Sequence, residues 1–109
     1  LLVNDTIQTG SADELISFKD GSKIDLKSKS ELKLISKHPK AFKLNKGTVS
    51  AEVTPQDKPM KIETSSAIIE VLGTVFRLSS QEKSSLLKVS RGKVAITDKK
   101  TGERVVVNK

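Results

Sequence analysis

The chain has 109 residues, a formal net charge of +7 and no cysteine. A chain of this length forms one domain and buries about two thirds of the surface that its unfolded form exposes. It therefore needs no disulfide bond or structural metal ion to stabilise its fold. The lack of cysteine excludes disulfide bonds and thiolate metal sites, and no apolar run approaches the ~20 residues that a membrane helix needs.

The positive charge comes mainly from lysine, because arginine occurs only at positions 77, 91 and 104. Lysines alternate with apolar residues, as in Lys23–Lys27, which is typical of the solvent face of an antiparallel sheet. Aromatic residues are limited to Phe18, Phe42 and Phe76, too few for a platform on which bases stack. The pattern therefore favours a solvated lysine face over a nucleic-acid surface.

The first firm element is a hairpin. Apolar and polar residues alternate from Ile16 to Leu26 on both sides of Asp20 and Gly21, and Asp-Gly is a preferred type I′ turn. Turn chemistry thus explains the Asp20 carboxylate better than catalysis or metal binding does.

A strand at Leu32–Ile35 is followed by a loop, residues 36–40, that holds His38. This only histidine has no second histidine or cysteine with which to bind a metal, so we expect an exposed loop residue. A second hairpin is predicted to turn at Asn45–Gly47.

Residues 61–78 carry the densest apolar signal and predict the centre of the core. Apolar side chains occupy both faces of the first strand here, with Ala67, Ile69 and Val71 on one side and Ile68 and Leu72 on the other. We expect a central strand buried on both faces, a bend at Gly73-Thr74, and a second strand through Val75–Leu78.

The rest of the chain predicts a meander of three strands around Val89, Val94 and Val105, with turns at Arg91-Gly92 and at residues 98–102. A glycine at the end of the second loop suits a type I turn closed by a bulge. The residues expected in the core of this half are Ile69, Val71, Phe76, Leu87, Val89, Val94 and Ile96.

A glycine stands just ahead of a β-branched residue that opens a strand at four places, Gly21, Gly47, Gly73 and Gly92, which are 26, 26 and 19 residues apart. The spacing predicts one supersecondary unit used about four times. We therefore expect an all-β fold of stacked antiparallel hairpins with little or no helix, as a small sandwich, a roll or a solenoid-like stack.

The sequence offers no enzyme chemistry. A hydrolase needs a nucleophile, a base and an orienting acid, and His38 between lysines is a poor base. Glu52, Glu63 and Glu70 have apolar neighbours on strands and are interpreted as the polar face of a sheet rather than a glycosidase pair. We expect neither catalytic residues nor a metal or cofactor.

Four segments occur in an order and spacing that resembles the FecR domain, over Leu15 to Val107. They are DGSKIDL at 20–26, LNKGTVSAEV at 44–53, VLGTVF at 71–76 and KVSRGKVAI at 88–96. The third, with its GT-x-F element, is the most specific. The resemblance implies structural roles for Asp20, Gly21, Ser22, Gly47, Gly73, Thr74, Phe76 and Gly92, and it assigns no ligand-binding residue.

The resemblance also implies a single FecR-like domain over residues 1–109, with its core at 15–107, in the periplasm or on the surface of a bacterium. In the best-known members this domain is the periplasmic part of a membrane-spanning sigma-factor regulator, which an outer-membrane iron-siderophore transducer contacts. This chain shows neither the cytoplasmic anti-sigma helices nor the membrane span of those members. Since it starts without methionine, we expect a fragment of a larger envelope protein, with any membrane segment outside it.

Three functions remain open at this stage. The first is a non-catalytic module that signals through a protein partner, either the transducer or a neighbouring envelope domain, by means of an exposed strand edge. The second is a surface module that binds an anionic polymer, such as cell-wall glycan or nucleic acid, through its lysines. The third is a structural spacer without a partner. The oligomeric state is left open.

Overall fold

The structure is a computed structural model that describes residues 2–37, 39–54, 59–80 and 85–109. The regular structure in these residues is entirely β, which confirms the expected fold class. None of them forms a helix of the length and hydrophobicity that a membrane crossing requires. The strands are β1 (Thr6–Gln8), β2 (Glu14–Ser17), β3 (Lys23–Leu26), β4 (Glu31–Lys37), β5 (Lys40–Glu52), β6 (Met60–Glu63), β7 (Ala67–Val71), β8 (Val75–Ser80), β9 (Ser85–Arg91), β10 (Lys93–Asp98) and β11 (Arg104–Asn108).

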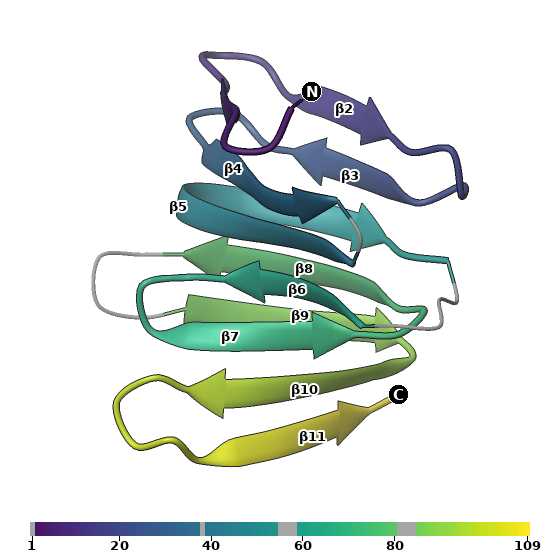
Figure 1. Ribbon diagram of the computed structural model, residues 1–109, viewed down its shortest axis with the longest axis vertical. Helices are drawn as coiled ribbons and strands as arrows, with labels where there is room; N and C mark the ends of the chain where they lie inside the picture. Colours follow the sequence, from purple (N-terminus) through teal and green to yellow (C-terminus); the bar gives the residue numbers. More distant parts are fainter. Residues whose placement is uncertain (1, 38, 55–58, 81–84) are drawn as a thin grey trace.

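The strands form two layers that share β5. The long sheet has the order β1-β4-β5-β6-β7-β10-β11, and the short sheet has the order β2-β3-β5-β8-β9. Neighbouring strands are antiparallel except for β5 and β6, which are parallel. Figure 1 shows β6 and β7 of the long sheet in front of β8 and β9 of the short sheet. The layers therefore build a sandwich whose strands stack along one axis.

The second predicted hairpin, at Asn45–Gly47, is wrong, because β5 continues through it without reversing. The strand pairs with β4 in the long sheet up to Lys46 and with β8 in the short sheet from Gly47 onward. Gly47 has φ +96°, and a Cβ there would lie 2.0 Å from the Ser30 hydroxyl oxygen. Glycine thus allows the strand to bend from one layer to the other, where any side chain would collide with Ser30.

The core lies between the two layers and is built from alternate residues of their strands. The largest fully buried side chains are Phe42, Phe76, Ile24, Leu26, Leu32, Leu44, Met60, Ile62, Ile69, Leu78, Val49 and Val71. The burial expected for Ile69, Val71, Phe76, Val89 and Val94 is confirmed, whereas Leu87 and Ile96 are only partly buried against this cluster.

The expectation that β7 is buried on both faces is wrong. Ala67, Ile69 and Val71 are buried, whereas Ile68 on the opposite face is half-buried and Leu72 is 51% exposed. The strand is central only within its sheet, where it pairs with β6 and β10. In a two-layer fold each sheet has one inner face, so only one side of the strand can be covered.

The β2–β3 hairpin is confirmed, with Ile16 opposite Ile24. Its turn is not type I′, since Gly21 has φ +93° and Asp20 is not among the described residues with positive φ. The Gly21 amide donates to the Phe18 carbonyl at 3.1 Å and the Phe18 amide donates to the Ser22 carbonyl at 2.9 Å. This is a type I turn closed by a glycine bulge, which needs only one residue with positive φ.

The predicted three-stranded meander is wrong at its first turn. β9 pairs with β8 in the short sheet, and β10 pairs with β7 in the long sheet, so the chain changes layer at Gly92. The β10–β11 hairpin is confirmed, and its loop closes as expected, with the Gly102 amide donating to the Asp98 carbonyl at 2.8 Å.

Three of the points where the chain changes layer, after Val53, at Gly73-Thr74 and at Gly92, stack on one another at one end of the sandwich. The amide and carbonyl of Val53 bond the carbonyl and amide of Thr74 at 2.8 and 3.0 Å. The Thr74 hydroxyl then donates to the Lys93 carbonyl at 3.0 Å, and Gly92 exchanges two backbone bonds with Lys109. Gly73 and Gly92 thus mark changes of layer at this end, whereas Gly47, which pairs with Ser80 at the far end of β8, marks one at the opposite end. The repeated changes of layer give the fold a solenoid-like character.

Candidate functional site

The three carboxylates considered for catalysis do not form one group. Glu52 lies on the short sheet, while Glu63 and Glu70 lie on β6 and β7 of the long sheet. The Glu63 carboxylate forms an ion pair with the Lys99 ammonium at 2.5 Å. No group of three or more histidine, cysteine or acidic side chains that could hold a metal occurs in the described parts of the chain. His38 lies outside the described residues.

Asp20 is engaged within its turn. Its carboxylate accepts bonds from the Lys40 ammonium at 2.5 Å and from the Ser22 amide at 2.9 Å. These bonds hold the pKa of the Asp20 carboxyl below its usual range, and the bond from Lys40 has the largest effect. Lys40 also lies 5.2 Å from the centre of the Phe18 ring, which meets the Phe42 ring edge-on.

The remaining motif residues lie in the turns, at the changes of layer and in the core. Ser22 shares a hydrogen bond of 3.1 Å with the Thr54 hydroxyl and accepts one from the Thr54 amide. Gly73 has φ +103° where the chain passes from β7 to β8. Thr74 and Phe76, which follow, are 1% and 2% exposed. Among these residues, Phe76 alone borders a hollow, which lies on the outer face of the short sheet.

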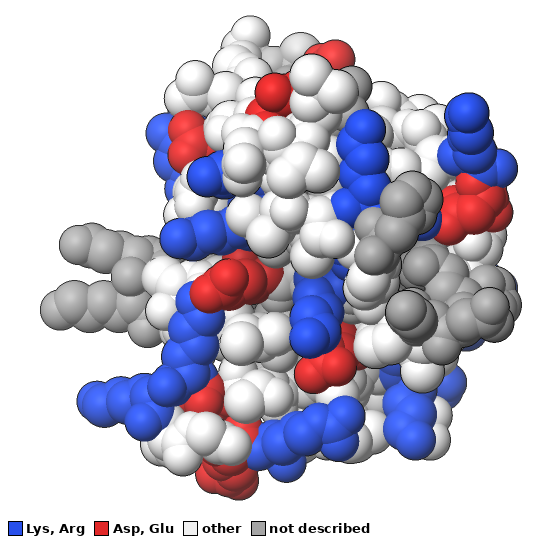
Figure 2. All heavy atoms as spheres, viewed as in Figure 1, with Lys and Arg blue, Asp and Glu red and all other residues white. Residues whose placement is uncertain are grey.

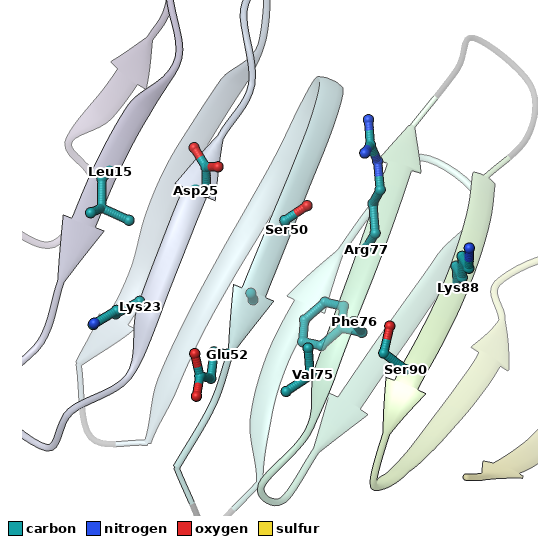
Figure 3. A pocket seen from close by; sticks show the side chains of 11 residues that line it. Leu15, Lys23, Asp25, Ser50, Glu52, Val75, Phe76, Arg77, Lys88 and Ser90 are labelled. Atoms are coloured by element: carbon teal, nitrogen blue, oxygen red, sulfur yellow. The ribbon is translucent and has the colours of Figure 1, made fainter.

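The outer face of the short sheet is hollowed. An open depression of about 420 Å³ lies over β2, β3, β5, β8 and β9, and its side chains come from all five strands (Figure 3). Its central row follows the strand register and consists of Leu15, Asp25, Ser50, Arg77 and Lys88. Since its residues alternate with core residues, this surface is the solvent side of the sheet.

The charge of this face is divided along the row. Toward β3, Asp25 accepts a bond from the Lys27 ammonium at 2.6 Å, which raises the pKa of Lys27. Toward the edge, Arg77 on β8 lies directly opposite Lys88 on β9. Neither of these two cations forms an ion pair with a described residue. Like charges directly across a ladder repel, so this end of the face is suited to an anionic group.

The amino-acid sequence alone does not indicate that Arg77 and Lys88 form a pair. The two residues are eleven positions apart, and only the β8–β9 register makes them neighbours. The alternation of each strand would have shown that both point outward, but it could not show that the strands pair.

The outer face of the long sheet carries mixed charge. Figure 2 shows lysine and arginine spread over this side with acidic groups between them. Lys43 lies opposite Glu63, and Lys61 lies opposite Glu70. The basic residues on this face therefore do not gather into one patch.

A second hollow, of about 450 Å³, opens between the two layers near β9 and β10. Its walls are mainly apolar and include Ile69, Leu78, Leu87 and Ile96. It lies where the short sheet ends at β9 while the long sheet continues through β10 and β11.

Comparison with known proteins finds one family and one shared fold. The family model described as FecR protein matches residues 5–95. Two crystal structures of a putative anti-sigma factor from Parabacteroides distasonis ATCC 8503 share the fold, each at 16% identity, with TM-scores of 0.76 and 0.75 over 98% and 96% of this chain. The chain spans 61% and 60% of those two chains. The comparison with curated proteins finds no match.

Proposed function

Because the chain belongs to the FecR protein family, we propose that it is a non-catalytic, extracytoplasmic signalling module that regulates a sigma factor through contacts with other proteins. Membership of the family over residues 5–95 is the observation that carries this proposal. The fold that the chain shares with a putative anti-sigma factor supports it. The described carboxylates support the non-catalytic part, since Glu52 lies on the other sheet from Glu63 and Glu70, and Glu63 is held in an ion pair with Lys99.

We also propose a cellular location and a class of binding partner. Residues 1–109 would form one FecR-like domain of a larger envelope protein, exposed to the periplasm or at the cell surface of a bacterium. The partner would be an outer-membrane transducer or a neighbouring envelope domain, and the motif residues from Asp20 to Gly92 would shape the fold rather than touch the partner. Two hollows and unpaired strand edges give such a partner a surface to contact.

Binding of an anionic polymer through lysine is less well supported. A polymer such as glycan or nucleic acid needs a continuous basic track, and its affinity falls steeply with salt. On the long sheet, acidic residues stand directly across from Lys43 and Lys61. The basic pair on the short sheet covers two positions, which fits a single acidic group better than a long chain of charges.

A transcript profile tests the proposed function. Residues 5–107 are deleted from the gene in its own host, and RNA levels are compared with those of the parent strain. A regulator predicts a change in a limited set of genes whose promoters share one sigma-factor signature. Replacing exposed Lys19 by alanine serves as the control for editing the gene and should leave the profile unchanged. A deletion strain with the parental profile would contradict the proposal.

A further inference from the structure

The two layers of the sandwich end at different places. At the C-terminal end, β10 and β11 extend the long sheet, whereas the short sheet stops at β9. Figure 1 shows β10 and β11 below β9, at the bottom of the stack. The chain otherwise supplies hairpins to the layers in turn, with β6–β7 in the long sheet, β8–β9 in the short sheet and β10–β11 in the long sheet. The next position in this alternation, beside β9, is empty among the described strands.

Exposure along one row of the inner face shows the effect of this mismatch. Ile62, Ile69, Ile96 and Val105 lie side by side across β6, β7, β10 and β11. Ile62 and Ile69 are each 1% exposed, Ile96 is partly buried, and Val105 is 49% exposed. The row belongs to the core side of the long sheet throughout, so its last members have no described strand of the short sheet over them. The hollow of about 450 Å³ between the layers lies at this point.

The edge of β9 borders the uncovered region. Among the described strands β9 pairs with β8 alone, so its other side is free to bond a further strand. Leu86 on this strand is 67% exposed, and Leu87, on the inner side, lines the apolar hollow. Unpaired edges of this kind are used in strand addition, where backbone bonds give affinity and alternate side chains give specificity.

We propose that an extended segment of the protein partner pairs with the free edge of β9 and completes the short sheet. This inference rests on the proposed function and names the surface that function would use. The segment alternates apolar and acidic residues. Its apolar side chains face inward and cover Ile96 and Val105, and its acidic side chains face outward beside Lys88.

The positive charge beside the β9 edge is the reason to expect acidic side chains in the added segment. A strand added to β9 extends the outer row that ends in Arg77 and Lys88, and a carboxylate there would neutralise two cations that have no described ion-pair partner. The second charged residue on β9, Arg91, is also exposed and basic. Opposite charges across a ladder stabilise the pairing, and here they would select against a neutral or basic segment.

The same charges disfavour a second copy of this chain as the occupant. Pairing β9 with β9 of another copy would bring two sets of Lys88 and Arg91 to one seam, without an acidic residue on either strand. Like-charge juxtaposition of this kind suppresses association.

The test uses a synthetic eight-residue peptide in which valine alternates with glutamate. Hydrogen exchange of the protein's amides is followed by NMR as the peptide is titrated. We expect protection of β9 amides, and no protection from a matched peptide in which lysine replaces glutamate. Protection elsewhere, equal protection by both peptides, or none at all would overturn the inference. Dimerisation of the protein through β9, detected by sedimentation without peptide, would also overturn it.

Two pairs of variants locate the contact. Lys88→Glu should weaken peptide binding at least tenfold, while Lys23→Glu, an exposed lysine toward the other end of the same face, should change it less than twofold. Val105→Ser should weaken binding severalfold, while Leu72→Ser, at a similar exposure of 51%, should not. Thermal melts confirm that each variant folds. Equal effects within both pairs would overturn the inference, and the transcript profile of the deletion strain would still decide the proposed function separately.

Discussion

The carbonyl oxygen of Gly73 lies 2.6 Å from the position that a Cβ on Gly92 would occupy. The two glycines are where the chain passes between layers, from β7 to β8 and from β9 to β10. Both have positive φ, +103° and +99°. Stacking of the layer changes therefore depends on the absence of a side chain at position 92.

The first prediction concerns Gly92→Ala. The added Cβ meets backbone atoms of Gly73 and Thr74, which cannot move away as a flexible side chain could. We expect a loss of about 2–4 kcal/mol in the free energy of unfolding, from backbone strain and the clash together. Urea denaturation measures it. Gly102→Ala is the control, because its φ is +76° and nothing lies within 4 Å of its added Cβ, so about 1 kcal/mol is expected. Equal losses in the two variants would contradict the stacking argument.

The second prediction concerns Ser30, which is fully buried beside Gly47. Its hydroxyl oxygen accepts a bond from the Thr48 amide at 2.9 Å, where β5 enters the short sheet. Ser30→Ala leaves that amide without its acceptor, and we expect a loss of about 1–3 kcal/mol in the free energy of unfolding. Exposed Ser28 is the control, and its replacement by alanine should change stability by less than about 0.5 kcal/mol. If Ser30→Ala leaves the free energy of unfolding unchanged, the layer change does not need this bond.

The sequence predicted the alternating core well because period-two burial depends only on neighbours along the strand. The structural roles of the glycines were harder to predict. Gly21 closes a hairpin, whereas Gly47 bends a strand between layers, although each has a φ close to +95° and each precedes a strand segment. Local chemistry demands glycine in both cases. Whether the glycine closes a hairpin or bends a strand between layers is decided by pairing with distant residues, such as that of Gly47 with Ser80.

The same limit applies to the functional surface. The sequence shows that Lys88 and Leu86 alternate with inward residues, but it does not show that β9 ends its sheet. That fact depends on β10 pairing with β7, whose residues lie more than twenty positions earlier. An edge and its uncovered neighbours are properties of the sheet order, which has no local signature in the chain.

The third prediction is a pH dependence at Asp20. Its pKa is lowered in the folded state by the bond from Lys40, so the ionised carboxylate stabilises the fold at pH values above its unfolded pKa of about 3.9. That stability is lost as the pH falls through the lowered folded value. Asp20→Asn should therefore be less stable than the parent by about 1 kcal/mol at pH 7, a size typical of a partly exposed charged bond.

Urea denaturation of the parent and of Asp20→Asn, repeated from pH 7 to pH 2, measures the difference. It should shrink as the Asp20 carboxyl of the parent becomes protonated. A difference that stays constant to pH 2 would show that the variant acts through the turn conformation instead of the charge.

Site-specific photo-crosslinking in the host cell tests most directly whether this domain works by protein contact. A photoreactive amino acid replaces Leu86 on the free edge of β9, and Leu72, exposed near the β7–β8 layer change, serves as the matched position. We expect one discrete protein adduct from position 86 and none from position 72. An adduct from position 72 alone would contradict the assignment of the β9 edge, and the absence of any protein adduct from both positions would contradict the claim that the domain acts through a protein partner.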